Sequence, residues 1–121
     1  MPRRKNVSKM RKNFNEKMAN LLPHEKEKLE SVEKLALELM DQYHLWYYNF
    51  KFGYGSTYRG KCTVDTIRIQ YLFALNSPIE EIRNTILHEI AHAVAGVENG
   101  HNCYWQAVAT DMGVTFKNYR Q

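Results

Sequence analysis

The sequence predicts an α+β fold in one domain of a 121-residue chain. Apolar residues recur at helical spacing from Glu25 to Tyr43, aromatic residues alternate with other residues from Trp46 to Phe52, and a second apolar helix follows Pro78. A chain of this length closes one core and has no room for a second full domain. We expect a domain of residues 21–121, preceded by an N-terminal arm of residues 1–20.

The first helix of the domain is expected from Glu25 to about Tyr43. The boundary lies at Leu21-Leu22-Pro23, since proline is accepted in a first helical turn and disfavours helix in the residue before it. Glu and Lys fill one face of this amphipathic helix, and the apolar residues that should face the core are Leu29, Val32, Leu35, Ala36, Leu39, Met40 and Tyr43.

Three strands should form a small antiparallel sheet. The first covers Trp46 to Phe52 and is followed by a turn at Gly53-Tyr54-Gly55-Ser56, where glycine reaches positive φ without strain. The others are expected at about 58–63 and 66–71, with Ile67 and Ile69 on one face.

The second long helix should begin at Ser77 and Pro78. Serine is a favoured N-cap and proline a favoured first helical residue, and Ser77 and Glu80 have capping-box spacing. The helix continues through Ile82, Ile86 and Val94, and its widely spread apolar residues predict that it is largely buried.

The net charge of +4 is unevenly distributed. Residues 1–20 contain seven basic residues and one acidic residue, a net charge of +6, so the rest of the chain carries −2. The arm is either disordered or loosely helical. It is either a solubilising tail or a contact for nucleic-acid phosphates, for which the candidates are Arg3, Arg4, Lys5, Lys9, Arg11 and Lys12.

Several classes of protein are excluded by composition. No apolar run approaches the roughly 18 residues of a membrane span, and no apolar signal segment follows the basic start, so we expect a cytoplasmic protein with no membrane partner. We also expect a monomer. Cys62 and Cys103 are too few for a disulfide framework and are expected to be buried thiols.

The second helix contains the pattern His88-Glu89-Ile90-Ala91-His92. Residues four apart on a helix differ by about 40° around the axis and about 6 Å along it, so both imidazoles can reach one metal ion. Glu89 lies beside them, too displaced to be an easy ligand but able to hold a water molecule at that ion as a general base.

A third ligand should follow shortly after this helix. Gly96 can end the helix in a left-handed cap, and Asn99-Gly100 is a strong turn signal. We favour His101, at the start of an expected helix from Asn102 to Met112. Glu98 is a rival, at the position where metzincins place their third histidine, and Cys103 is a less favoured substitute. Three imidazoles and a water molecule would make an open, catalytic type of site for one Zn²⁺ ion.

Over about residues 30–113 the chain resembles the SprT-like family of zinc metallopeptidase domains, which includes bacterial SprT proteins and Spartan-type proteases. The most specific matching segment is Asn84 to Ala93, which contains the TxxHExxHA pattern, and it is followed by Gly100-His101 and Trp105. Upstream, Gly60-Lys61-Cys62 is similar to a glycine-containing hairpin of the family. The resemblance implies a zincin-like α+β fold, in which His88, His92 and His101 bind zinc and Glu89 is the base. The cysteine-rich zinc ribbon of many members has no counterpart in residues 1–121.

The expected activity is therefore hydrolysis of a protein or peptide substrate, with nucleic-acid-associated proteins as one substrate class. Asn84 and Asp111 are candidates for orienting the histidines, Tyr104 for stabilising an oxyanion, and Trp105 for packing that holds the third ligand in place. The alternative is a zinc-stabilised binding or structural module, such as a phage component, without turnover.

Overall fold

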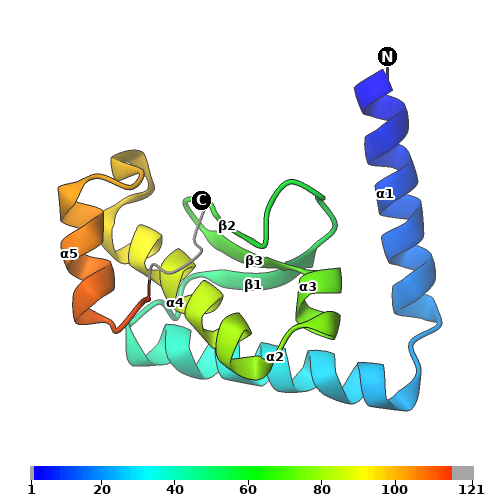
Figure 1. Ribbon diagram of the computed structural model, residues 1–121, viewed down its shortest axis with the longest axis horizontal. Helices are drawn as coiled ribbons and strands as arrows, with labels where there is room; N and C mark the ends of the chain where they lie inside the picture. Colours follow the sequence, from blue (N-terminus) through cyan, green and yellow to red (C-terminus); the bar gives the residue numbers. More distant parts are fainter. Residues whose placement is uncertain (1, 116–121) are drawn as a thin grey trace.

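The computed structural model describes residues 2–115, with side chains from Ser8 onward, and has the expected α+β fold. Five α-helices, one short 3₁₀-helix and a three-stranded sheet make up this part of the chain (Figure 1). The elements are α1 (Pro2–Ala19), α2 (Pro23–Gln42), β1 (Asn49–Gly53), β2 (Gly60–Cys62), β3 (Thr66–Gln70), α3 (Tyr71–Asn76), α4 (Ile79–Ala95), η1 (Val97–Asn99) and α5 (Cys103–Asp111).

The sheet is mixed, and the prediction of an antiparallel sheet is wrong for one of its two strand pairs. The strand order is β1-β3-β2, with β1 parallel to β3 and β2 antiparallel to β3. The segment after Gly53 carries the chain to the far edge, and β3 then returns between the other two strands. Residue alternation identifies a strand but contains no information about its neighbour, so the sequence could not reveal this insertion.

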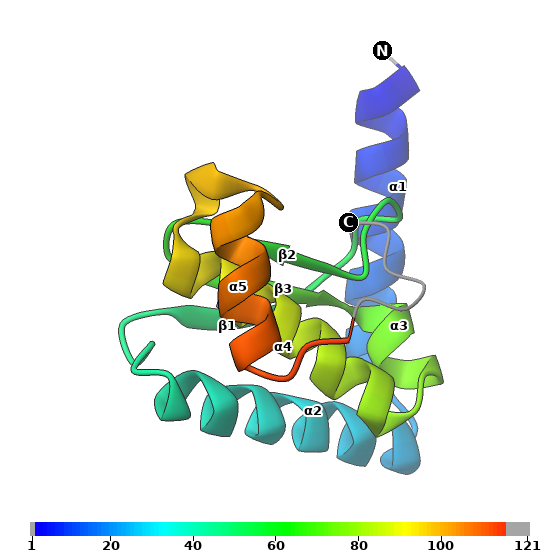
Figure 2. The same ribbon diagram turned by 60° about the vertical axis from the view of Figure 1, so that its left-hand side comes forward.

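One face of the sheet packs on helices. Helix α4 contacts β2, β3 and α2, and α2 also contacts β1, so α4 lies within the core of the domain (Figure 2). Its apolar residues meet the inner face of the sheet, and the fully buried side chains include Val32, Ile67, Ile69, Ile82, Ile86 and Ile90. This burial makes α4 a rigid carrier for its polar residues.

The first strand begins later than expected. Helix α2 ends at Gln42, and the chain then turns through His44, whose φ of 64° is unusual for a residue other than glycine. The Leu45 N–H donates to the Met40 carbonyl, and the Tyr48 N–H donates to the Leu45 carbonyl. Trp46, expected to lie in the strand, is instead an exposed residue of this turn.

The start of α4 also differs from the prediction. Pro78 is the N-cap rather than the first helical residue, and Ser77 makes no capping bond to α4. Ser77 instead ends α3, a short helix that was not expected from the sequence, by donating its N–H to the Phe73 carbonyl. Helix α3 begins at the end of β3, where the Gln70 side chain accepts a hydrogen bond from the Phe73 N–H.

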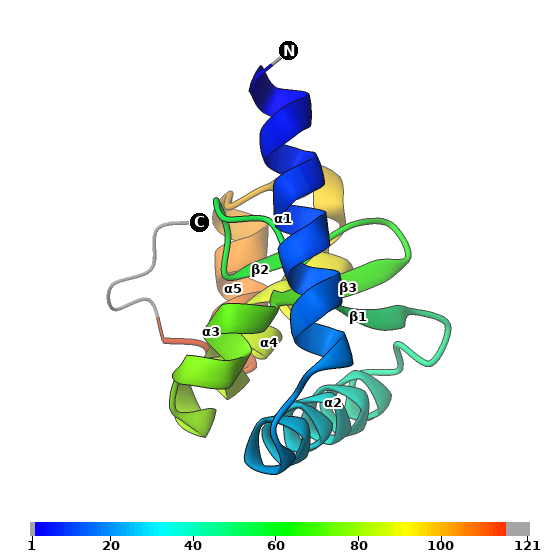
Figure 3. The same cartoon turned by 90° about the vertical axis from the view of Figure 1, so that its right-hand side faces the viewer.

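The N-terminal arm forms the helix α1, which stands beside the sheet and projects beyond the body (Figure 3). Phe14 packs against the rings of Tyr54 and Tyr71, and Lys17 forms an ion pair of 2.6 Å with Glu25 of α2. Within the described chain, no helix combines the length and apolar character needed to cross a membrane.

Candidate metal centre

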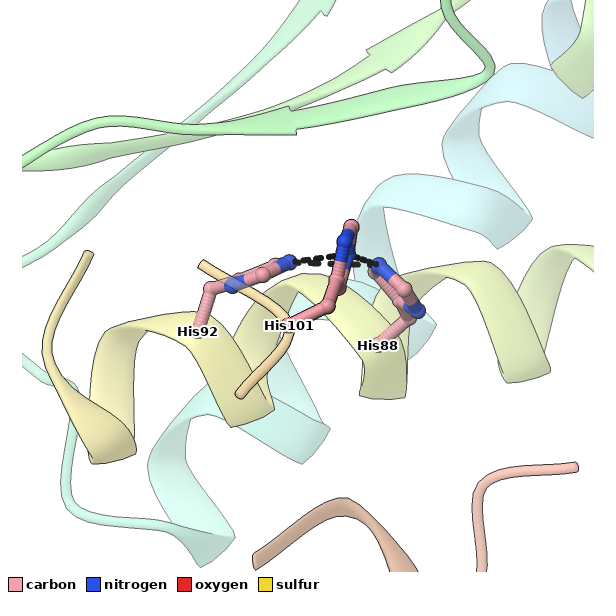
Figure 4. Close-up of side chains that lie close together, drawn as sticks. All are labelled: His88, His92 and His101. Carbon is pink, nitrogen blue, oxygen red and sulfur yellow. Dashed lines mark hydrogen bonds between the residues drawn. The ribbon is translucent and has the colours of Figure 1, made fainter. Parts of the chain in front are cut away.

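Helix α4 places His88 and His92 one turn apart on the side that faces β2 (Figure 4). Their Nε2 atoms are 3.2 Å apart. His88 is buried and His92 is half-buried, because the helix passes beneath the sheet. The local helical spacing therefore converges both rings on one point, as the sequence predicted.

His101 reaches the same point from the turn after α4. Gly96, with φ 99° and ψ 124°, ends α4, and Gly100 has φ 56°. Asn102 then caps α5, its side-chain oxygen accepting from the Trp105 N–H. His101 therefore lies immediately before the cap of α5, the helix that was expected from Asn102 to Met112 and is observed at Cys103–Asp111.

Side-chain amides fix the turn that carries His101. The Asn99 side chain donates to the Ala95 carbonyl at 2.6 Å, and the Asn102 side chain donates to the Asn99 side-chain oxygen at 2.9 Å. Gln106 donates to the His101 carbonyl at 3.2 Å. Although His101 is exposed, these hydrogen bonds fix the position of its backbone.

The three Nε2 atoms form a nearly equilateral triangle. The Nε2 of His101 lies 3.1 Å from that of His88 and 3.0 Å from that of His92 (Figure 4). Zinc–nitrogen distances of about 2.0–2.1 Å in a tetrahedron require nitrogens about 3.3–3.4 Å apart, close to the observed spacing. The triangle therefore fits one small metal ion.

The electrostatics of the triangle also suit a metal ion. Burial and the two neighbouring imidazoles lower the pKa of His88 to about 3, and burial and the His101 ring lower the pKa of His92 to about 4. Burial also lowers the pKa of His101. At neutral pH the rings are therefore uncharged, which is the form that binds metal. Three converging lone pairs repel one another unless a proton or cation lies between them.

Glu89 lies beside the triangle and is almost fully buried, with 2% of its surface exposed. Its Oε2 atom is 4.0 Å from the Nε2 of His88 and has no hydrogen-bond partner among the described residues. Burial raises the pKa of this carboxyl to about 8. An unsatisfied buried carboxyl is unfavourable, so the site is suited to a cation and its water ligand, which would supply both charge and hydrogen bonds.

Gly60 of β2 packs directly over Glu89. A Cβ atom at position 60 would lie 3.0 Å from the Cγ of Glu89 and 3.1 Å from its Oε2. Only a residue without a side chain lets the strand pass this close without displacing the carboxylate. In the sequence, Gly60 stands out only through the family resemblance, and its contact with Glu89 carries no local signal because it joins segments distant in sequence.

Trp105 packs against all three imidazoles. Its ring stacks on His92 with an interplanar angle of 23° and centroids 5.1 Å apart, and its centroid is 4.6 Å from those of His88 and His101. The indole is 3% exposed. It thus limits the orientations open to the rings and joins α5 to the site.

The other candidate ligands, Glu98 and Cys103, do not belong to the histidine triangle. Within the described chain, His88, His92 and His101 form the one group of three or more potential ligand side chains, which includes neither Glu98 nor Cys103. Cys103 is exposed, contrary to prediction, and Cys62 is half-buried. Tyr104 is 57% exposed.

Asn84 and Asp111 are not seen to orient the histidines. The Asn84 side chain donates to the Thr115 carbonyl and accepts from the Thr115 N–H, so it anchors the segment after α5 to α4. Asp111 is exposed at the end of α5.

A family model described as the SprT-like family matches residues 33–121. The chain belongs to the SprT-like family. Membership in this family indicates a metalloprotease-type function and an association with zinc, and the histidine triangle is compatible with metal binding. No curated protein and no solved structure is similar enough to the chain to count as a match.

Proposed function

We propose that the chain is a zinc-dependent endopeptidase that hydrolyses peptide bonds in proteins or peptides. The observation that supports this most directly is the buried Glu89 carboxyl beside three converging imidazoles, whose Oε2 atom has no hydrogen-bond partner in the part of the chain that the structure describes. A purely structural zinc site needs no such group, whereas a site that activates water does.

His88, His92 and His101 would hold one Zn²⁺ ion through their Nε2 atoms. When bound, the ion would lower the pKa of a water molecule toward about 7 and polarise the substrate carbonyl. Glu89 accepts the proton of the attacking water at Oε2 and returns it to the departing amine. Gly60 leaves room for this carboxylate beneath β2.

We also propose that α1 contacts nucleic acid, so that the substrates include proteins associated with it. Helix α1 projects from the body and carries the basic residues of the arm, and each Lys or Arg at a phosphate releases counterions. Replacing Arg4, Lys9 and Lys12 with Gln is the variant that tests this contact. A cytoplasmic monomer remains the proposed form of the protein.

Cleavage of an unfolded protein tests the peptidase proposal. We expect the zinc-loaded chain to hydrolyse casein, and we expect a chelator to abolish cleavage and added zinc to restore it. The readout is release of acid-soluble fragments together with electrophoresis of the substrate. A chain that binds zinc but cleaves neither casein nor DNA-bound proteins would favour a non-catalytic module.

A further inference from the structure

The outer face of the sheet carries a row of three cations, one from each strand. Lys51 of β1 and Lys61 of β2 both pair in register with Arg68 of β3, the central strand. Neighbouring strands are about 4.8 Å apart, so the row runs straight across the sheet with its Cα atoms at this spacing. We refer to these three residues as the basic row.

The row points away from α4. Ile67 and Ile69, which flank Arg68 on β3, are fully buried, and Gly60 beside Lys61 packs against Glu89 of α4. Because side chains alternate along a strand, the row lies on the opposite face. Lys51 and Lys61 are exposed and Arg68 is half-buried.

No carboxylate neutralises the row within the described residues. The ion pairs there are Lys17 with Glu25 and the contact of His88 with Glu89, and Lys61 lies 5.9 Å from the centre of the Tyr58 ring. Like charges directly opposite on neighbouring strands destabilise a sheet. A row of three unneutralised cations therefore carries a cost in stability that a bound polyanion would remove.

The charge of the body is strongly segregated. The segment 49–70 contains four basic residues and one acidic residue, a net charge of +3, whereas α2 contains six acidic and three basic residues, a net charge of −3. In Figure 1, α2 lies below the sheet and α1 rises at the right-hand end of the sheet. The mildly acidic body expected from the total charge thus has one positive face.

We propose that this outer sheet face binds the phosphate backbone of a nucleic acid through Lys51, Arg68 and Lys61. A regular row of cations with no carboxylate among them matches a chain of phosphates. The proposal extends the nucleic-acid contact proposed for α1 and does not depend on peptidase activity. Because Lys61 adjoins Gly60, the bound strand would cross the outer face of the sheet, with β2 between it and Glu89.

Fluorescence anisotropy with a labelled single-stranded poly-dT oligonucleotide tests this proposal. The variant carries Lys51→Gln, Lys61→Gln and Arg68→Gln. We expect its affinity to fall about tenfold or more at low salt, and the slope of log affinity against log salt to decrease by about 2, since each phosphate contact in a single strand contributes about 0.7. The melting temperature should stay equal or rise, because like charges are removed.

Two further triple variants test whether the loss of binding is specific to the basic row. The first is a control on α2 and α4. Lys26→Gln, Lys34→Gln and Arg83→Gln remove the same charge from exposed positions of α2 and α4 and should leave most of the binding and the slope intact. Equal losses in this control and in the basic-row variant would overturn the proposal.

The α1 variant distinguishes this proposal from that for the arm. Loss of binding with Arg4, Lys9 and Lys12 replaced, but not with the basic row replaced, would overturn the sheet proposal and leave the α1 contact standing. If the basic-row variant instead loses affinity for poly-glutamate but not for poly-dT, the face binds acidic polypeptides and the nucleic-acid assignment is wrong.

Discussion

Replacing Glu89 with Gln is expected to leave the metal bound and to lower kcat/KM for peptide hydrolysis by about 10²–10⁴-fold. The amide has nearly the same shape as the carboxylate beneath Gly60, so the packing of β2 on α4 should survive. It cannot accept a proton from water, which removes the proposed general base. The loss should therefore fall mainly on kcat, and zinc content should match that of the parent.

Glu98→Gln is the matched control, since it makes the same chemical change in an exposed carboxylate of η1, outside the histidine triangle. Its activity should remain near that of the parent. If Glu89→Gln retained cleavage at the parent rate, the proton-transfer role would be wrong. If it lost zinc together with activity, Glu89 would have to be reassigned to holding the metal.

Replacing Trp105 with Ala should destabilise the fold by about 3–5 kcal/mol, the usual range for deleting a large buried aromatic side chain. Domains of this size have about 5–15 kcal/mol of stability in total, so the variant should approach the limit of folding. The affected contacts include those with the three imidazoles, and the affinity for zinc should fall as the rings become less constrained.

Urea unfolding followed by circular dichroism, with chelator present, measures this effect without a contribution from metal. Tyr104→Ala, at the adjacent exposed position, should change stability by only about 0.5 kcal/mol or less. A cost below about 1 kcal/mol for Trp105→Ala would show that the indole does not join α5 to the core.

The sequence predicted the site well where the determinants are local. The four-residue spacing of His88 and His92 needs only a helix, and the glycine and asparagine signals between them and His101 predicted the chain reversal. Spacing alone left Glu98 and Cys103 as rivals of His101, because the choice of third ligand depends on where the turn directs each side chain. In the same way, Ser77 satisfied the rule for an N-cap but ends α3.

The features that escaped prediction depend on which strands are neighbours. Once β3 lies between β1 and β2, Gly60 faces Glu89, and Lys51, Arg68 and Lys61 align on the other face. The residues of the Gly60–Glu89 contact and of the basic row lie far apart in the sequence, and no periodic pattern links them. Total charge likewise concealed the positive face, since the acidic residues of α2 cancel it in the sum.

The zinc content of the purified chain and of His101→Ala tests the central claim, that three imidazoles hold one metal ion. His24→Ala, which changes an exposed histidine away from the triangle, is the control. Elemental analysis should find one zinc ion per chain in the parent and in the control. A folded His101→Ala variant should have lost most of its zinc. Full retention of zinc by His101→Ala, or a folded parent that takes up no zinc, would contradict the account.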